Sequence, residues 1–320
     1  MSSSSRRASV ADVARARPTA RRRARARRRL SHRASANAAE DAVDALGFSK
    51  LDWARVRTPA RYLGNEVGAF RAPWDARDGV EARFCVAYPE TYEVGASNLG
   101  HVVLYTVLNQ TPGTMCDRCY LPADDMIELM RARDAPLFAV ESKRGLAEFD
   151  AVGLSVAYEL GAINILEMMH LARIPLTWEA RDDAPDRPWN VEENGSWPMV
   201  FAGGPTATSN PEPFAAFLDF VCLGDGEDVL PEIAESIKRS KREKLTREET
   251  LYRLAVDVEG VYVPRFYDAP PGWGGAVFPV REGVPARPKR RVAMPDPMLQ
   301  IGLVPYVETV HDRMTVEIRR

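Results

Sequence analysis

The chain lacks several features that define common protein classes. It contains four cysteines among 320 residues: Cys85, Cys116, Cys119 and Cys222. That number is too small for a disulfide-stapled domain and is typical of a protein from a reducing compartment. No apolar run reaches the roughly 18 residues that a membrane span needs. The best apolar stretch, residues 151–172, is interrupted by Glu159 and Glu167, so we expect no membrane partner.

The first 39 residues contain no lysine and a single acid, Asp12, but they hold 12 arginines and many serines and alanines. This composition is typical of an organelle transit peptide. We interpret residues 1–40 as a disordered transit peptide for the chloroplast, with the mitochondrion as the alternative destination. A basic arm that binds nucleic acid is the other interpretation. The rest of the chain holds 31 basic and 44 acidic side chains, and this acidic body argues against nucleic acid as a partner.

Beyond residue 80, short apolar runs alternate with helical periodicity. The strand candidates are residues 83–89, 135–142, 149–158, 197–204 and 217–227. Helical stripes separate them, for example Val229, Leu230, Ile233 and Ile237. Nearly continuous apolar strands separated by helices indicate a parallel sheet covered on both faces. The sequence therefore predicts an α/β fold with a doubly wound, flavodoxin- or Rossmann-like sheet of five parallel strands.

The composition also suggests how the chain is divided. Residues 41–80 form a lead-in segment, and residues 81–245 contain the five predicted strands. Residues 246–320 are expected to be an α+β linker region that ends in a strand-like segment. Thr246 and Glu249 have the spacing of a capping box, which predicts a helix start.

Ligands of open parallel sheets bind in the crevice outside the carboxyl ends of the strands. Glycines at these ends allow a close approach of the backbone, and free amides at helix starts favour polar groups. The candidate cofactor-binding residues are Tyr92, Glu93, Gly95, Ser97, Gly100, Ser155, Tyr158, Glu159, Gly203, Gly204, Pro205, Gly224, Gly226 and Glu227. A tight strand-to-helix turn is the alternative role for each glycine. Because the glycines recur at several strand ends, we expect them to form one pocket along one edge of the sheet.

The sequence predicts neither a catalytic residue nor a metal site. Cys116 and Cys119 form a CxxC motif, which can be half a zinc site or a redox pair. No second CxxC and no HxxxH accompany it, as a zinc site would require. A redox pair would stand at a helix start, whereas this motif runs into Pro122. Cys85 and Cys222 lie in apolar strands and are expected to be inert core residues. His101 is expected to be a satisfied surface or packing histidine.

Several segments carry a family resemblance. "FDAVGLSVAYELGAINILEMMHLA", "VFAGGPTATSNPEPF" and "FVCLGDGEDVLPEI" occur in that order and resemble the cobalamin-binding-type domain that precedes the catalytic barrel in many radical SAM proteins. "RYLGNEVGAFRAPWD" and "YPETYEVGASNLGHVVLYTVLN" resemble one subfamily of these, large bacterial-type proteins of undefined reaction. The closing "VPYVETVHDRMTVEI" resembles the strand that leads into that subfamily's cluster-binding loop. The resemblance extends from about residue 61 to residue 320.

The resemblance implies an N-terminal cofactor- or substrate-binding domain of a radical SAM enzyme. Its partner would be a barrel in cis that holds a 4Fe-4S cluster and S-adenosylmethionine. The CxxxCxxC motif that would ligate this cluster is absent, so we expect a truncated product or an N-terminal half that is inactive alone.

The small-molecule cofactor that the resemblance implies is cobalamin. No histidine of the chain fits the DxHxxG pattern, so bound cobalamin would lack histidine ligation. The alternative hypothesis is a non-catalytic Rossmann-like scaffold module that has lost corrinoid binding.

Overall fold

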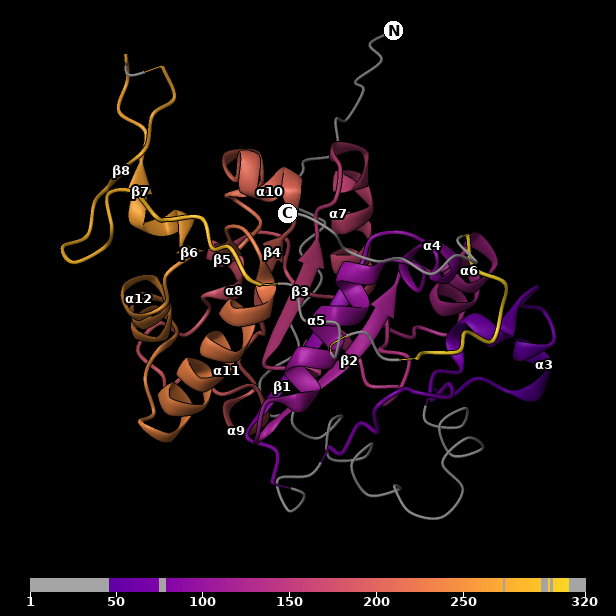
Figure 1. The fold of residues 1–320 in the computed structure, drawn as a ribbon. Coiled ribbons are helices and arrows are strands. Elements are labelled where there is room, and N and C mark those ends of the chain that lie inside the picture. The colour runs from indigo at the N-terminus through magenta and orange to yellow at the C-terminus, as the bar shows by residue number, and fades with distance from the viewer. Residues whose placement is uncertain (1–45, 75–78, 273, 295–298, 300–301, 311–320) are drawn as a thin grey trace, which may run out of the picture.

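The computed structural model describes residues 46–74, 79–272, 274–294, 299 and 302–310. Their centre is a six-stranded sheet with the order β2-β1-β3-β4-β5-β6 (Figure 1). The strands are β1 (Ala82–Tyr88), β2 (Thr114–Tyr120), β3 (Ala151–Ser155), β4 (Met199–Gly203), β5 (Phe220–Cys222) and β6 (Val261–Tyr262). The first five are parallel, and β6 pairs antiparallel with β5. The predicted doubly wound sheet of five parallel strands is confirmed, and the structure adds a sixth strand at its edge.

Helices connect the strands and cover both faces of the sheet (Figure 1). The α-helices are α3 (Lys50–Trp53), α4 (Tyr92–Gly95), α5 (Leu99–Gln110), α6 (Asp124–Ala132), α7 (Ala162–Leu171), α8 (Trp178–Arg181), α9 (Val191–Asn194), α10 (Pro205–Ser209), α11 (Gly226–Arg242) and α12 (Arg247–Asp257). The 3-10 helices are η2 (Pro59–Tyr62), η4 (Leu146–Glu148), η5 (Glu159–Gly161), η6 (Glu212–Phe214) and η7 (Pro264–Phe266). A separate small hairpin pairs β7 (Tyr267–Asp268) with β8 (Phe278–Pro279).

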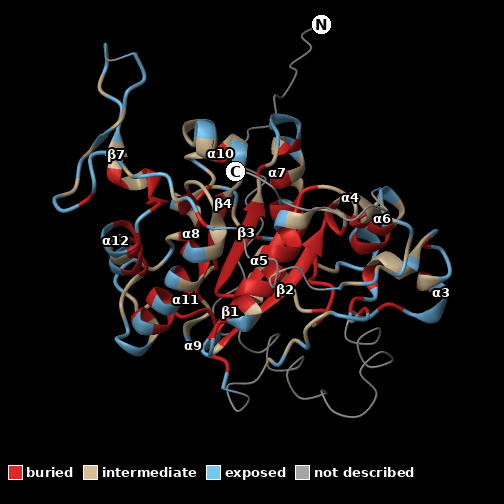
Figure 2. Ribbon diagram, viewed as in Figure 1, coloured by how far each residue is buried: buried red, intermediate tan, exposed pale blue. Residues whose placement is uncertain are grey.

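The two faces of the sheet carry two hydrophobic cores. One core joins Phe84 and Val86 of β1 to α5, α11 and α12. The other joins Cys85 and Ala87 of the same strand to α6 and α7. Alternate residues of a strand point to opposite faces, so a strand that is buried on both faces is either apolar or pairs its polar groups inside the protein. Figure 2 shows the resulting continuous burial of the central strands.

Two predictions about helices in the second half of the chain are confirmed. The stripe of α11 that includes Val229 and Ile233 is fully buried in the core. The helix α12 begins with a capping box, in which the Thr246 hydroxyl accepts from the Glu249 amide and the Glu249 carboxylate accepts from the Thr246 amide. This helix and β6 belong to the main sheet and core, so the sheet continues past residue 245, where the sequence pattern placed the boundary.

The predicted second strand is wrong. Residues 135–142 lie outside the named strands, and the strand next to β1 is Thr114–Tyr120. The segment 135–142 instead runs beside this edge strand, where the Val140 amide donates to the Arg118 carbonyl at 2.8 Å. It therefore covers the edge of the sheet, which would otherwise expose unpaired backbone groups.

The beginning of β5 is anchored by charge. Asp219 is buried, and its carboxylate accepts from Arg181 at 3.0 Å and from Arg247 at 2.8 Å. The amide of Val200 donates to the same carboxylate at 2.8 Å. Because the three donors come from α8, α12 and β4, this single carboxylate fixes two helices to the sheet.

Among the described residues, no helix is both long enough and apolar enough to cross a membrane.

Candidate functional site at the carboxyl edge of the sheet

The order of the strands defines a switch point. The chain passes from β1 to β2 on one side, whereas β3 pairs with β1 on the other side. The loops that follow β1 and β3 therefore leave the sheet in opposite directions, and open α/β sheets hold their ligands between two such loops. In this chain the two loops are residues 89–98 and 156–161.

Three polar residues connect these two loops. The Tyr158 hydroxyl donates to the Glu90 carboxylate, and the Asn164 side-chain amide donates to the Pro89 carbonyl at 2.9 Å. The hydrogen bond to Glu90 raises the pKa of Tyr158 to about 12. Tyr158 is 38 % exposed, so its ring lies at the surface of the switch point. Sequence reasoning named Tyr158 but left Glu90 out of the site, because an acid after a strand resembles an ordinary solvated side chain.

All the predicted site residues lie at or shortly after the carboxyl ends of strands. After β1 come Tyr92, Glu93, Gly95, Ser97 and Gly100; after β3 come Ser155, Tyr158 and Glu159; after β4 come Gly203, Gly204 and Pro205; after β5 come Gly224, Gly226 and Glu227. Parallel strands end at one edge of a sheet, and the last residues of β3 and β4, Ser155 and Gly203, are paired in register. Whether these residues bind a ligand stays a prediction.

Close approaches within the chain explain several of the glycines. A Cβ on Gly204 would lie 2.8 Å from the Val156 carbonyl oxygen, and a Cβ on Gly224 would lie 2.1 Å from that of Arg291. Both glycines also have positive φ angles, 106° and 97°, which side chains rarely adopt. The backbone that approaches them belongs to the protein itself.

The remaining predicted glycines divide into two kinds. Gly95 faces the Tyr120 ring and Gly226 faces Leu104, with added Cβ atoms 2.5 Å and 2.6 Å away, so both allow tight internal packing. Cβ atoms on Gly203 and Gly100 would make ordinary contacts, with nearest neighbours at 3.6 Å and 3.4 Å. These two positions therefore tolerate a Cβ without a clash, and at this edge they are the better candidates for contact with a ligand.

Several predicted side chains interact with neighbouring parts of the chain. The Tyr92 hydroxyl, on a residue that is 1 % exposed, donates to Glu66 at 2.6 Å. Glu93 pairs with Arg61 at 2.7 Å, and the Ser97 hydroxyl donates to the Val94 carbonyl at 2.9 Å.

The other predicted side chains are more open to solvent. Glu159 and Pro205 are exposed, and Ser155 and Glu227 are partly exposed. Pro205 begins α10, and Glu227 lies in the first turn of α11.

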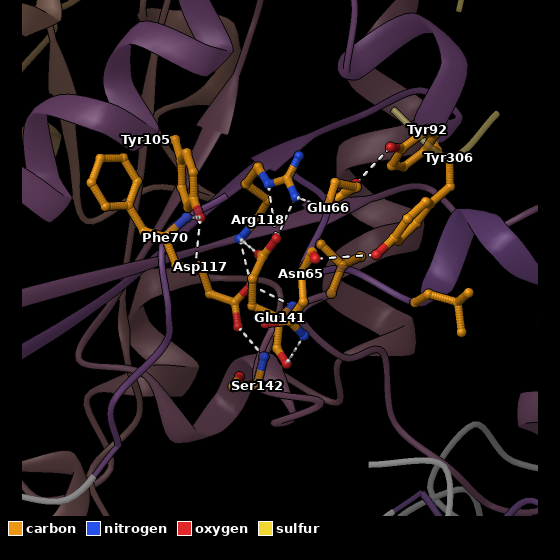
Figure 3. A network of polar contacts seen from close by, with 12 residues as sticks. Asn65, Glu66, Phe70, Tyr92, Tyr105, Asp117, Arg118, Glu141, Ser142 and Tyr306 are labelled. Carbon is orange, nitrogen blue, oxygen red and sulfur yellow. Dashed lines mark hydrogen bonds and ion pairs between the residues drawn. The ribbon is translucent and has the colours of Figure 1, made fainter. Parts of the chain in front are cut away.

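Sequence reasoning missed a buried polar network beside this edge (Figure 3). Arg118 of β2 is fully buried, and its guanidinium donates to both Glu66 and Glu141. Asp117 precedes it and accepts from the amides of Glu141 and Ser142 at 3.0 Å and 2.8 Å. The network joins the lead-in segment, β2 and the segment that covers the edge strand.

The network has unusual proton affinities. Burial raises the pKa of Glu141 to about 8, with a further contribution from Asp117, although Arg118 acts in the opposite direction. Burial also lowers the pKa of Lys143, whose ammonium donates to the carbonyls of Leu63 and Val140. Charged groups removed from water depend on such partners, so the loss of any one member of the network should destabilise the fold.

His101 differs from its prediction. It is 1 % exposed and packs against the rings of Tyr88 and Tyr120, with centroids 5.7 Å and 5.3 Å away. Neither of its ring nitrogens has a hydrogen-bond partner among the described residues, so it is a packing histidine without satisfied nitrogens. Burial, together with Arg118, lowers its pKa to about 3. The imidazole is therefore neutral and enclosed by aromatic rings.

The CxxC motif is part of β2. Cys116 faces the core beneath α5, whereas Cys119 faces the opposite core beneath α6. Two thiols on opposite faces of one strand do not converge on a metal ion. No group of three or more histidine, cysteine, aspartate or glutamate residues in the described chain could hold a metal ion either. Cys85 and Cys222 are buried, as predicted, and burial raises the pKa of both thiols.

This doubly wound sheet, covered by helices on both faces, defines the class of the domain as an open, mostly parallel α/β fold. The family model described as "Radical SAM proteins, N-terminal" matches residues 100–264, slightly more than half of the chain. The chain belongs to this family. No curated protein matches it.

Two solved structures are similar to the chain. One is the cobalamin-dependent S-adenosylmethionine radical enzyme OxsB, solved with aqua-cobalamin and S-adenosylmethionine bound, with 13 % identity and a TM-score of 0.34 over 65 % of this chain. The other is the radical S-adenosylmethionine methyltransferase TsrM from Kitasatospora setae, solved with tryptophan and a SAM analogue, with 14 % identity and a TM-score of 0.33 over 59 %. The chain spans 24 % and 29 % of the lengths of these two structures.

Proposed function

We propose that this chain is the cofactor-binding N-terminal part of a radical SAM protein, and that its ligand is a corrinoid held at the switch point between β1 and β3. Membership in the family of radical SAM N-terminal domains supports the general role. The switch point supports the location, because it is where open parallel sheets bind ligands.

The residues at this edge fit the polar periphery of a corrinoid better than its metal. Tyr158 and Glu159 lie at the surface and offer a hydroxyl and a carboxylate to amide groups, and Gly203, at the end of the neighbouring strand β4, is paired in register with Ser155. His101 is enclosed by Tyr88 and Tyr120, so the chain would bind the corrinoid without a histidine ligand. A bound corrinoid would supply cobalt redox and alkyl-transfer chemistry that the protein side chains lack.

The proposed partner is a radical SAM barrel in cis. The barrel would carry the three thiolates of the cluster and the S-adenosylmethionine site, because the sequence of this chain has no CxxxCxxC motif. In this division of roles, the residues described here bind and orient the cofactor. They do not generate the radical.

A spectroscopic titration tests the proposal. Hydroxocobalamin added to the full chain is expected to show a saturable change in its visible spectrum and to remain with the protein on gel filtration. Gly203→Val adds a branched side chain at the carboxyl end of β4, where the Cβ itself makes only an ordinary contact with Cys222 at 3.6 Å, and should weaken binding at least about tenfold, the equivalent of roughly 1.4 kcal/mol. Gly302→Val is the control for the added side chain, because its Cβ meets no atom within 4 Å and the residue lies outside the switch-point loops.

The outcomes separate the alternatives. Binding that both glycine variants retain would place the corrinoid elsewhere on the molecule. No binding by the folded native chain would favour the scaffold hypothesis, which is supported by the glycines that the protein's own backbone already fills.

We further propose that residues 1–40 direct import into the chloroplast, with the mitochondrion as the alternative. These residues lie outside the described part of the chain, and the proposal depends on their composition. A fluorescent protein fused after residue 40 should accumulate in the organelle, and the same fusion with all 12 arginines of residues 1–39 changed to glutamine should stay outside it.

A further inference from the structure

The exposed side of α11 borders a groove that the proposed function does not use. The groove has a volume of about 730 Å³ and lies between the end of α5, α11 and α12. Val107, Pro112, Pro231 and Val258 give it an apolar part, and α11 contributes most of its charged side chains. A volume of this size is ample for contact with another molecule.

The solvent-facing residues of α11 form one regular stripe. They are Asp228, Glu232, Glu235, Arg239 and Arg242, all of which are exposed. Their spacing alternates between four and three residues, which is the spacing of a seam between two packed helices. The first three are acidic and the last two are basic, so the charge changes sign along the seam.

This order makes the stripe complementary to itself. When two copies of α11 lie antiparallel, Glu235 of each copy faces Arg239 of the other, and Glu232 faces Arg242. Both pairs are centred on Ile237, so a single two-fold axis produces all four contacts. Two-fold symmetric interfaces use the same surface on both subunits and require this kind of self-complementarity.

We infer that this face of α11 binds a second copy of the chain, in an antiparallel two-fold arrangement. The inference goes beyond the proposed function, because it involves a helix face rather than the switch-point loops. Opposite charges at matched positions favour this partner and this orientation. In the parallel orientation, like charges would face one another along the whole seam.

Each of the four charges already has a partner in its own chain. Glu232 pairs with Arg291, Arg239 with Glu243 and Arg242 with Glu81, and these three pairs are at least partly exposed. Glu235 pairs with Lys238, whose side chain is only 3 % exposed, so this carboxylate must keep its partner while it faces a second copy. Exposed ion pairs contribute little to stability, so their charges can be shared with a second copy at small cost. An interface of this kind is expected to be weak and to dissociate as salt screens the charges.

Sedimentation velocity on the full chain tests the inference. At about 50 mM salt the native chain should associate reversibly into a dimer, and about 500 mM salt should weaken the association. The double variant Arg239→Glu with Arg242→Glu has an acidic seam. Glu232→Arg with Glu235→Gln has a basic seam and keeps an amide oxygen beside Lys238, whose side chain is only 3 % exposed. Each variant alone should lose at least about tenfold in dimer affinity, because like charges then meet across the axis.

Recombination of the variants provides the decisive comparison. An equimolar mixture of the acidic and basic variants should form a dimer with one chain of each, detectable by native mass spectrometry. The fourfold variant should dimerise with itself again. The control, Arg131→Glu with Arg173→Glu, makes the same change in net charge as the acidic variant with two exposed arginines outside α11 and should dimerise like the native chain.

Three results would overturn the inference. One is a native chain that stays monomeric at low salt up to about 100 μM, a concentration at which even weak specific contacts associate. The second is a single-sign variant that dimerises normally. The third is a mixture of acidic and basic variants that forms no mixed dimer. None of these results depends on whether a corrinoid binds at the switch point.

Discussion

Arg118 and Glu66 form an ion pair in which neither side chain is exposed to solvent, although 52 residues separate them in the sequence. Arg118 belongs to β2, at the edge of the sheet, and Glu66 belongs to the segment that precedes β1. The pair therefore attaches the lead-in segment to the sheet through buried charge. It also places Glu66 where the Tyr92 hydroxyl reaches it, next to the loop of the candidate site.

Glu66→Ala should destabilise the protein strongly. The substitution leaves Arg118 with Glu141 as its remaining carboxyl partner and leaves the Tyr92 hydroxyl without its acceptor. Removing one partner of a buried pair typically costs about 3–5 kcal/mol. Chemical denaturation monitored by circular dichroism measures the loss in the free energy of unfolding.

Glu81→Ala, which breaks an exposed pair with Arg242, is the control and should change the free energy of unfolding by less than about 0.5 kcal/mol. Equal effects of the two variants would contradict the role of Glu66.

Glu141 should make the protein less stable as the pH rises from 5 to 8. Its pKa is about 8 in the folded chain and about 4.5 when unfolded, so the folded state holds a proton that the unfolded state releases in this range. The slope should flatten above pH 8. The variant Glu141→Gln lacks this titrating group. Between pH 5 and pH 8, the free energy of unfolding of the native chain should therefore fall by at least about 1 kcal/mol more than that of the variant. Parallel pH profiles of the two proteins would show that Glu141 is ionised throughout.

His101 should make the protein less stable as the pH falls below about 6.5. Its pKa is about 3 in the folded chain and 6.5 in the reference state, so the unfolded state gains a proton between these values and the folded state does not. The contribution of His101 to the free energy of unfolding is therefore fully present above pH 6.5 and is lost as the pH falls towards 3. The variant His101→Leu should lose less stability between pH 7 and pH 4 than the native chain. An NMR titration that shows His101 protonated near pH 6.5 would refute the prediction.

The two glycines Gly153 and Gly203 should respond differently to alanine. A Cβ on Gly153, within β3, would lie 2.4 Å from the Phe201 ring, so Gly153→Ala should cost about 1–3 kcal/mol through overpacking. A Cβ on Gly203 would lie 3.6 Å from its nearest neighbour, so Gly203→Ala should be nearly neutral for stability. Thermal unfolding of both variants checks the contrast. A large loss for Gly203→Ala would show that this end of β4 has no spare room, and it would weaken the case for a ligand there.

Much of the fold could be predicted from local patterns. The strands β1, β3, β4 and β5 are runs of apolar residues, and α5 and α11 carry apolar stripes at helical spacing. Such patterns are visible in sequence because a strand that is covered on both faces is usually a nearly continuous run of apolar residues. The capping box of α12 was visible for the same local reason, since both partners lie within one helical turn.

The strand β2 could not be predicted in this way. Its sequence "TMCDRCY" carries an acid and a base in the middle, which is typical of a loop, while residues 135–142 have the apolar composition of a strand. Asp117 and Arg118 are buried because Glu66, Glu141 and the amide of Ser142 satisfy them from distant parts of the chain. A local pattern holds no information about these partners.

The candidate site shows the same division. Local composition is enough to predict that glycines and polar residues follow the carboxyl ends of strands, because strand and turn residues differ in composition. The surroundings of each glycine depend on the fold. Val156 and Arg291 lie against Gly204 and Gly224, whereas a Cβ on Gly203 would make only an ordinary contact. Packing depends on which segments meet, and contacts between residues far apart in the chain are set by the whole fold rather than by local sequence.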